Sequence, residues 1–129
     1  MNKTISAILA FCLALGAAWG ARYYGSGMEA AEVIRKLSGL RMALAFYTLE
    51  HKTAPSAFED VLRDGKLEAA PRLKLPGHFG SSAVRNTPSF EIRDSGGWAY
   101  VNDPRAPRFG LVFIDCWHPD EKGRYWSEF

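Results

Sequence analysis

Cysteine is scarce in this chain, and only Cys12 and Cys116 occur among its 129 residues. Cys12 lies in an apolar stretch near the N-terminus and Cys116 in a strand-like run near the other end, so we expect no disulfide between them. A single thiol in a folded domain is best explained by burial, where cysteine behaves as a small apolar residue. No base is expected beside Cys116, which argues against a catalytic role for it.

Runs of like charge are also missing. Sixteen lysines and arginines are interspersed with fourteen aspartates and glutamates, and the formal net charge is +2. Because binding to nucleic acid generally requires a basic patch, we expect no nucleic-acid partner. Internal repeats, glycine-rich phosphate loops and low-complexity tracts are absent too. The chain therefore has the composition of one ordinary globular domain and is too short for a two-domain enzyme.

An uncharged apolar stretch covers residues 5–19 and follows the single charge of Lys3. A short positive region followed by an apolar run is typical of an export signal. One interpretation is a signal peptide that is cut after Gly20, because Ala18-Trp19-Gly20 supplies the small residues that a cleavage site needs.

The same stretch is long enough to remain as a membrane helix. Extended to Tyr24, it spans about twenty residues, or about 30 Å of helix, which matches the apolar core of a bilayer. Arg22, Tyr23 and Tyr24 would then lie at the membrane interface as anchors. Length does not separate the two interpretations, so we expect residues 1–24 to be a signal or an anchor and residues 25–129 to form one domain.

Apolar residues spaced by three and four predict a helix over residues 28–51. Its apolar face consists of Ala30, Val33, Ile34, Leu37, Leu40, Leu44 and Tyr47. Further apolar residues on roughly the opposite side predict a second covering surface at the end of this helix; they are Met42, Phe46 and Leu49. A capping box of Ser56 and Glu59, with Gly65 as a stop, predicts a short helix over residues 57–64.

The pattern changes to an alternation of apolar and polar residues after a proline- and glycine-rich loop over residues 66–88. Residues 90–93 and 98–101 are predicted to form a β-hairpin. Residues 111–117 are apolar on both faces and are expected to form the inner strand, with residues 124–126 at an edge. The predicted fold class is α+β, a long N-terminal helix packed on a C-terminal antiparallel sheet of three or four strands.

This order of elements resembles the type IV pilin family, which includes the pseudopilins of type II secretion. Residues 40–62 resemble the pseudopilin pattern in which the helix ends in Leu-Arg, Ala-Leu, Tyr and an acidic-His pair, followed by a Pro and a short acidic segment. Residues 96–100 and 110–114 look like strands of pseudopilin-like sheets, and residues 120–127 are similar to the C-terminal loop. The resemblance covers nearly the whole chain.

The N-terminus differs from the family's pattern. Type IV pilins have a Gly at the cleavage site and a Glu four positions after the first mature residue. If Ile5 were that first residue, Thr4 would replace the Gly and Leu9 the Glu.

The resemblance implies a non-enzymatic subunit of a type II secretion or type IV pilus-like assembly. Its partners would be other pilin-like subunits or secretion-machinery proteins, in or at the inner membrane, with the sheet in the periplasm. The alternative is a soluble periplasmic domain, cut after Gly20, that binds a partner or ligand through an aromatic sheet edge. The aromatic residues concerned, which are otherwise expected to fill the core, are Trp98, Tyr100, Phe113, Trp117, Tyr125 and Trp126.

No cofactor is implied, except that a loop in this region carries calcium in some pseudopilins. Asp115, Asp120 and Glu121 lie close together in the sequence, with His118 between them, and are candidate calcium ligands. The competing interpretation is that Asp120 and Glu121 are solvated turn residues and that His118 caps a strand. The spacing matches neither a zinc motif nor an EF-hand.

Overall fold

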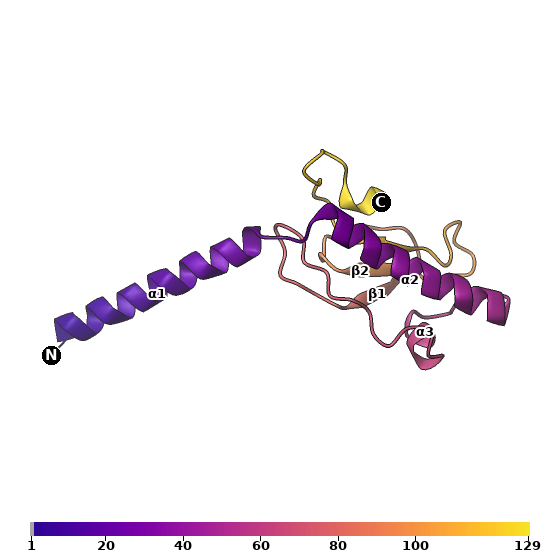
Figure 1. Cartoon of the computed structure of the whole chain (residues 1–129), viewed down its shortest axis with the longest axis horizontal. Coiled ribbons are helices and arrows are strands. Elements are labelled where there is room, and N and C mark those ends of the chain that lie inside the picture. The colour runs from indigo at the N-terminus through magenta and orange to yellow at the C-terminus, as the bar shows by residue number, and fades with distance from the viewer. Residues whose placement is uncertain (1) are drawn as a thin grey trace.

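A computed structural model describes residues 2–129 (Figure 1). In chain order the elements are α1 (Asn2–Gly25), α2 (Ala30–His51), α3 (Glu59–Arg63), β1 (Val84–Thr87), β2 (Trp98–Val101), β3 (Val112–Ile114) and the 3-10 helix η1 (Trp126–Glu128). α1 projects as a rod from the domain that the other elements form. The predicted α+β fold class is confirmed, but the sheet is mixed rather than antiparallel.

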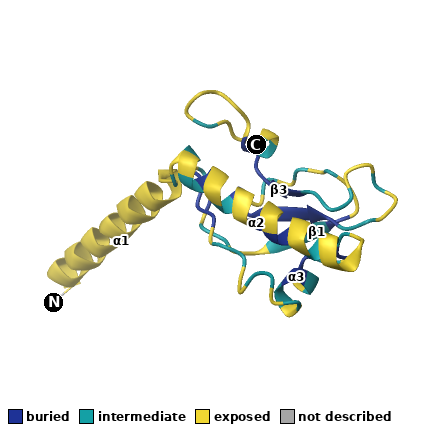
Figure 2. Ribbon diagram, turned by 45° about the vertical axis from the view of Figure 1, so that its right-hand side comes forward, coloured by how far each residue is buried: buried dark blue, intermediate teal, exposed yellow. Residues whose placement is uncertain are grey.

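The apolar N-terminal stretch forms α1, which has no buried residue (Figure 2). The helix is long and apolar enough to cross a membrane, although an N-terminal signal sequence would meet the same criterion. An exported protein is therefore consistent with the structure. Met1, which belongs to the predicted signal or anchor segment, lies outside the described residues.

A short segment from Ser26 to Glu29 separates α1 from α2, so the two helices do not form one continuous rod. Hydrogen bonds fasten this junction to the domain: the Met28 amide donates to the Lys74 carbonyl (2.8 Å), and the Gly77 amide donates to the Tyr24 carbonyl (2.9 Å). The rod is thus attached to the domain through the loop that follows α3.

α2 confirms the helix predicted over residues 28–51, and it ends at Lys52, which adopts a left-handed conformation. Its buried face consists of Val33, Leu37, Leu40, Ala43 and Leu44. This face follows the spacing of three and four because such residues line one side of an α-helix. Ile34, at the margin of the face, is 38% exposed.

The second covering surface predicted for the end of α2 is not found among residues 2–129. Met42, Phe46 and Leu49 are all more than half exposed. The domain covers only one side of the helix, so these three side chains form an uncovered apolar stripe.

The short helix predicted over residues 57–64 is confirmed as α3, but its cap differs from the prediction. Asp60, rather than Glu59, accepts hydrogen bonds from the Ser56 hydroxyl (3.0 Å) and the Ala57 amide (3.1 Å). Glu59 instead accepts a hydrogen bond from the Asn86 side chain of β1 (2.8 Å). Gly65 ends the helix with a φ of +75°, as its position after the apolar run predicts.

The central strand of the sheet is β2, which lies between β1 and β3. β1 pairs with β2 in parallel, with Val84 opposite Trp98, and β2 pairs with β3 antiparallel. Two predictions were therefore wrong: residues 84–87 form a strand although a loop was predicted there, and residues 111–117 do not supply the inner strand.

The predicted hairpin was also wrong, because residues 90–93 form no strand. The segment nevertheless places Phe90 and Ile92 against Phe113, and the ring centroids of the two phenylalanines lie 4.5 Å apart. Residues 90–93 alternate between apolar and polar because an extended segment that lies on a sheet also directs every second side chain toward that sheet.

The two faces of the sheet contribute to different apolar clusters. Trp98 and Tyr100 of β2, with Val112 and Ile114 of β3, belong to the main core that includes the buried face of α2. Ala99, Val101 and Phe113 face the other way and are covered by the segments before and after β2. A segment without regular structure thus takes the position of a second layer on that face.

The C-terminal segment forms a single bridge between Pro119 and Tyr125 instead of the predicted edge strand over residues 124–126. η1 follows and buries Trp126 in the main core. The Arg41 guanidinium of α2 donates a hydrogen bond to the Phe129 carbonyl (2.8 Å).

Candidate functional site

Four potential metal ligands converge at one end of the sheet: His78, Asp94, Cys116 and His118. The antiparallel pairing of β2 and β3 continues beyond both strands, because the Gly96 amide donates to the Asp115 carbonyl (2.9 Å) and the Asp115 amide donates to the Gly97 carbonyl (2.9 Å). This continuation brings the residues that precede β2 beside those that follow β3.

His78 reaches the same place from the loop between α3 and β1. Leu73 and Ser81 pair across the base of this loop, with two amide-to-carbonyl hydrogen bonds of 2.8 and 2.9 Å. The closed loop carries His78 inward until its side chain is 8% exposed. Three separate loops therefore supply the four side chains.

The ligand atoms lie within 4.8 Å of one another. His78 Nε2 lies 3.3 Å from Cys116 Sγ, 3.1 Å from His118 Nδ1 and 3.2 Å from Asp94 Oδ1. His118 Nδ1 lies 3.4 Å from Cys116 Sγ and 3.6 Å from Asp94 Oδ1. These distances describe a compact group of one sulfur, two nitrogens and one oxygen.

Gly96 makes room for the His78 ring. Its φ is +73°, and a Cβ at this position would lie 2.3 Å from His78 Cγ. A side chain at residue 96 would therefore displace the imidazole, so the loop before β2 supplies both Asp94 and the space for the His78 ring.

Backbone hydrogen bonds orient the side chains of Asp94 and Cys116. The Trp117 amide donates to Asp94 Oδ1 (2.9 Å), and the His118 amide donates to Cys116 Sγ (3.3 Å). Burial, together with the Asp94 and Asp115 carboxylates, raises the pKa of the Cys116 thiol to about 12, although the His118 amide lowers it. A buried thiol with a raised pKa is a poor nucleophile, even with a histidine beside it.

Burial lowers the pKa of His78 and outweighs the opposing effect of the Asp94 carboxylate. Near neutral pH the His78 ring is therefore uncharged and has one nitrogen lone pair, the form in which histidine binds a metal.

A second group of titratable residues lies at the end of α2 and comprises Glu50, His51 and Asp64. The Lys66 ammonium contacts the carboxylates of both Glu50 and Asp64. His51 pairs with Asp64 (3.2 Å) and stacks on Tyr47. This lysine already supplies the positive charge that a metal would supply, so the group is an ion-pair network between α2 and the segment after α3.

The predicted calcium ligands do not meet. Asp115 is buried, and its carboxylate accepts hydrogen bonds from the Arg93 amide (2.7 Å), the Ser95 hydroxyl (2.6 Å) and Arg85 Nε (3.3 Å). This carboxylate therefore holds the segment before β2 against the end of β3.

Asp120 stabilises the turn in which it lies, because its carboxylate accepts hydrogen bonds from the amides of Lys122 (2.8 Å) and Arg124 (2.9 Å). Glu121 is exposed. Neither group of ligand atoms found in residues 2–129 contains Asp115, Asp120 or Glu121. Calcium binding by these three residues stays a prediction, and their positions give it no support.

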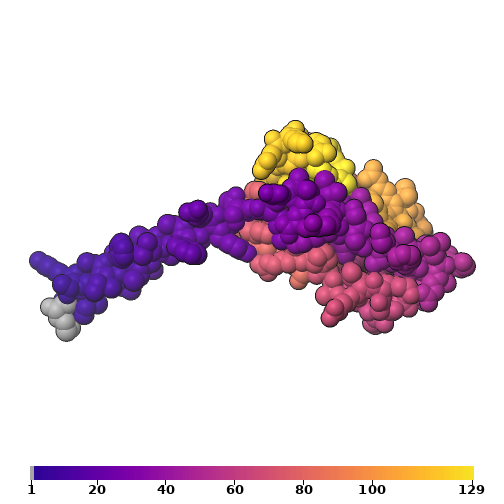
Figure 3. All heavy atoms as spheres, in the orientation of Figure 1, coloured from indigo at the N-terminus to yellow at the C-terminus, as the bar shows by residue number. Residues whose placement is uncertain are grey.

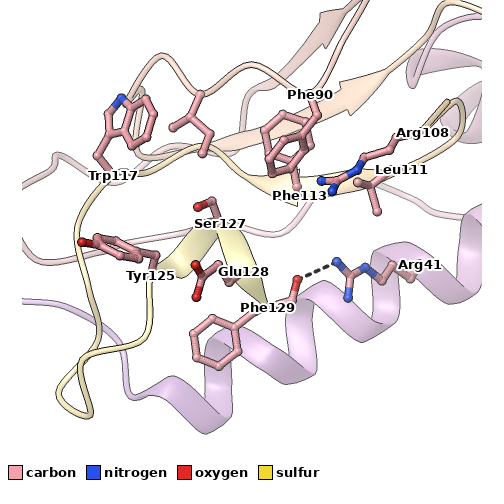
Figure 4. A pocket seen from close by; sticks show the side chains of 11 residues that line it. Arg41, Phe90, Arg108, Leu111, Phe113, Trp117, Tyr125, Ser127, Glu128 and Phe129 are labelled. Carbon is pink, nitrogen blue, oxygen red and sulfur yellow. Dashed lines mark hydrogen bonds between the residues drawn. The ribbon is translucent and has the colours of Figure 1, made fainter. Parts of the chain in front are cut away.

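A hollow of about 910 Å³ lies where the second face of the sheet meets η1 (Figure 4). Phe90 and Phe113 line one side, and Trp117 and Tyr125 lie at another, while Arg41 reaches toward the Phe129 carbonyl. Of the six aromatic residues predicted as core or binding surface, four are buried: Trp98, Tyr100, Phe113 and Trp126. Trp117 and Tyr125 are about half exposed, so the predicted aromatic surface is reduced to the rim of this hollow.

Sequence reasoning placed no base beside Cys116, and this expectation was wrong. His78, Asp94 and Cys116 are separated by 15 and 21 intervening residues, and only Cys116-Trp-His118 is a local pair. The one available signal was this Cys-x-His pair, which does not indicate that His78 and Asp94 lie beside it.

Comparisons with protein-family models, curated proteins and solved structures found no match to the chain.

Proposed function

We propose that the chain is a non-enzymatic, pilin-like or pseudopilin-like subunit of a type II secretion or type IV pilus-like assembly. In this proposal α1 anchors it in the inner membrane and the domain lies in the periplasm. The observation that carries the proposal is an apolar helix of 24 residues that buries nothing on the domain to which it is joined.

The exposure of α1 supports a role in contact with lipid or other helices. Twenty-four helical residues measure about 36 Å, enough to cross the apolar core of a bilayer. Figure 3 shows the rod standing clear of the domain, and its contacts with the domain, such as those of Tyr23 and Tyr24 with Phe79, lie at its C-terminal end. An apolar surface of this extent is stable only when lipid or protein covers it.

The uncovered stripe of α2 supports assembly rather than anchoring alone. Met42, Phe46 and Leu49 have the spacing of one helix face. Their side chains are exposed on the side of α2 that faces away from the sheet. In the proposed assembly a helix of another pilin-like subunit covers this stripe, because the neighbouring subunits would be anchored side by side in the same membrane.

The hollow of Figure 4 favours one second candidate, a soluble periplasmic domain that is released by cleavage after Gly20. Its apolar and aromatic lining, with the guanidinium groups of Arg41 and Arg108, suits a peptide or small ligand that carries a carboxylate. In this alternative α1 is removed and plays no part in the mature protein.

The mature N-terminus distinguishes these candidates. We expect mass spectrometry of the chain, purified from membranes of an expressing Gram-negative host, to find the α1 residues retained and the chain soluble only in detergent. A mature chain that starts at Ala21 and appears in the soluble periplasmic fraction would replace the proposed function with the second candidate.

A photo-crosslinking residue at Phe46 tests assembly in cells that carry the secretion or pilus system. We expect it to form an adduct with a second copy or with a subunit that itself has an apolar N-terminal helix, identified by mass spectrometry. The same residue at Arg63, which is exposed on α3, is the matched control and should form none. Equal labelling from both positions would contradict a docking role for the stripe.

A further inference from the structure

We propose that His78, Asp94, Cys116 and His118 form a structural zinc site that fastens together three loops at the end of the sheet. The proposal is independent of whether the chain assembles as a pilin-like subunit, because it concerns the interior of the domain.

The positions of the four atoms suit a tetrahedral metal ion. Five of the six distances among them lie between 3.1 and 3.6 Å. A tetrahedron with edges of about 3.3 Å has its centre about 2.0 Å from each corner, which matches the Zn–N, Zn–O and Zn–S distances of about 2.0–2.3 Å in proteins. The spacing of these five pairs of atoms therefore suits an ion of this size.

Hydrogen bonding among the four side chains does not account for their convergence. A ring nitrogen of histidine has a single direction in which it donates an N–H or accepts a hydrogen bond. His78 Nε2 nevertheless lies within 3.3 Å of three polar atoms, one each on Asp94, Cys116 and His118. A cation at the centre satisfies all four ligand atoms at once.

The kinds of ligand select zinc over calcium. Calcium takes six to eight oxygen ligands, whereas this group offers one carboxylate and three nitrogen or sulfur ligands. A thiolate with two imidazoles and a carboxylate suits Zn²⁺ in a tetrahedral site. The amide N–H that points at Cys116 Sγ also favours a charged sulfur.

Four protein ligands leave no position for water or substrate, which is characteristic of a structural site. The loops joined by the ion are residues 74–80, the segment before β2 and the segment after β3. Cys116 and His78 are almost fully buried while His118 is about half exposed, so the ion enters from the His118 side.

The test uses the full chain in detergent, stripped of metal with a chelator and then titrated with Zn²⁺. We expect one equivalent to bind, and the thermal midpoint to rise by about 10 °C when free Zn²⁺ is 100 times the Kd. Co²⁺ should give the visible absorption of a tetrahedral site together with a sulfur-to-cobalt charge-transfer band. Ca²⁺ should have no effect on the midpoint.

Substitutions assign the ligands. Cys116→Ser and Asp94→Asn should each weaken Zn²⁺ binding by about 100-fold or more, since even residues that only support metal ligands contribute 10–100-fold. Asp94 is partly exposed, so Asp94→Asn is the variant expected to fold without metal. Cys12→Ser and His51→Gln are matched controls, which alter the other thiol and a histidine of the second group and should bind as the unaltered chain does.

Any of three results would overturn the proposal. The first is a chain whose midpoint does not respond to Zn²⁺, and the second is a cobalt spectrum without the sulfur band. The third is Zn²⁺ affinity that persists in both Cys116→Ser and Asp94→Asn. The cobalt spectrum is measured on the unaltered chain, so it decides the matter even if a variant fails to fold.

Discussion

At the scale of single residues, Gly96 shows how an absent side chain positions a functional one. Its left-handed conformation turns the chain before β2, and its lack of a Cβ leaves room for the His78 ring. Glycine adopts a positive φ at little cost, whereas other residues are strained there. Two separate requirements therefore meet at one residue.

Gly96→Ala should lower the free energy of unfolding by more than the conformational cost alone. We expect a loss of about 1 kcal/mol from the positive φ and a further 1–3 kcal/mol because the new methyl group would overlap the His78 ring. Urea denaturation of the metal-stripped chain measures the change.

Gly65→Ala is the matched control for this substitution. Gly65 has nearly the same φ, +75° against +73°, but a Cβ there meets nothing within 4 Å. It should show the conformational cost only. If the two variants lost equal stability, the overlap between a side chain at residue 96 and the His78 ring would make no contribution to the loss.

Individual residues were predictable where their environment depends on nearby sequence. The burial of Cys116 follows from the apolar run that contains it, and it was predicted correctly. Its neighbours were not, because His78 and Asp94 reach it only through the closure of one loop and the continued pairing of β2 with β3. No local spacing encodes either event.

At the scale of elements, α2 has two apolar surfaces, one buried and one exposed. One is sealed against the sheet, and the other, the stripe of Met42, Phe46 and Leu49, remains exposed. Buried and exposed leucines on the same helix therefore provide a direct comparison of the two surfaces.

Leu40→Ala and Leu49→Ala should differ sharply in stability. Leu40 is 1% exposed, so its truncation leaves a cavity and should cost about 2–5 kcal/mol, whereas Leu49 is 67% exposed and its truncation should change stability by less than about 0.5 kcal/mol. Urea denaturation in detergent measures both. A comparable loss from Leu49→Ala would mean that the stripe packs within the single chain.

Helices were easier to predict than strands in this chain for a physical reason. α2 and α3 depend on spacing and capping within a few residues, so their positions follow from local sequence. β1 has no apolar alternation and exists because β2 lies beside it in parallel register. Residues 90–93 have the alternation but pack on a sheet face, where no partner strand pairs with them.

At the scale of the whole molecule, the rod and the domain are joined by few interactions. Tyr24 accepts a hydrogen bond from the Gly77 amide, and its ring lies 5.3 Å from that of Phe79. The Tyr23 hydroxyl accepts a hydrogen bond from Arg72 (2.8 Å). The preceding part of α1 extends beyond these contacts.

A chain that begins at Ala21 should therefore be as stable as the full chain and soluble without detergent. We expect the thermal midpoints of the two chains, measured by circular dichroism, to agree within about 3 °C. A chain that begins at Gly27 is the control, because it also loses the contacts of Tyr23 and Tyr24 and should melt about 5 °C lower. A large loss in the first chain would show that the rod stabilises the domain.

The packing of α2 against the last third of the chain has a consequence for biosynthesis. The ribosome makes this helix early, yet the core that contains Leu37 and Leu40 also contains Trp98, Ile114 and Trp126, which are made later. Until then the nascent helix lacks the part of its native cover that β2, β3 and η1 supply, and a chain terminated before β3 never completes it. Completion of this core therefore depends on residues that are synthesised well after α2.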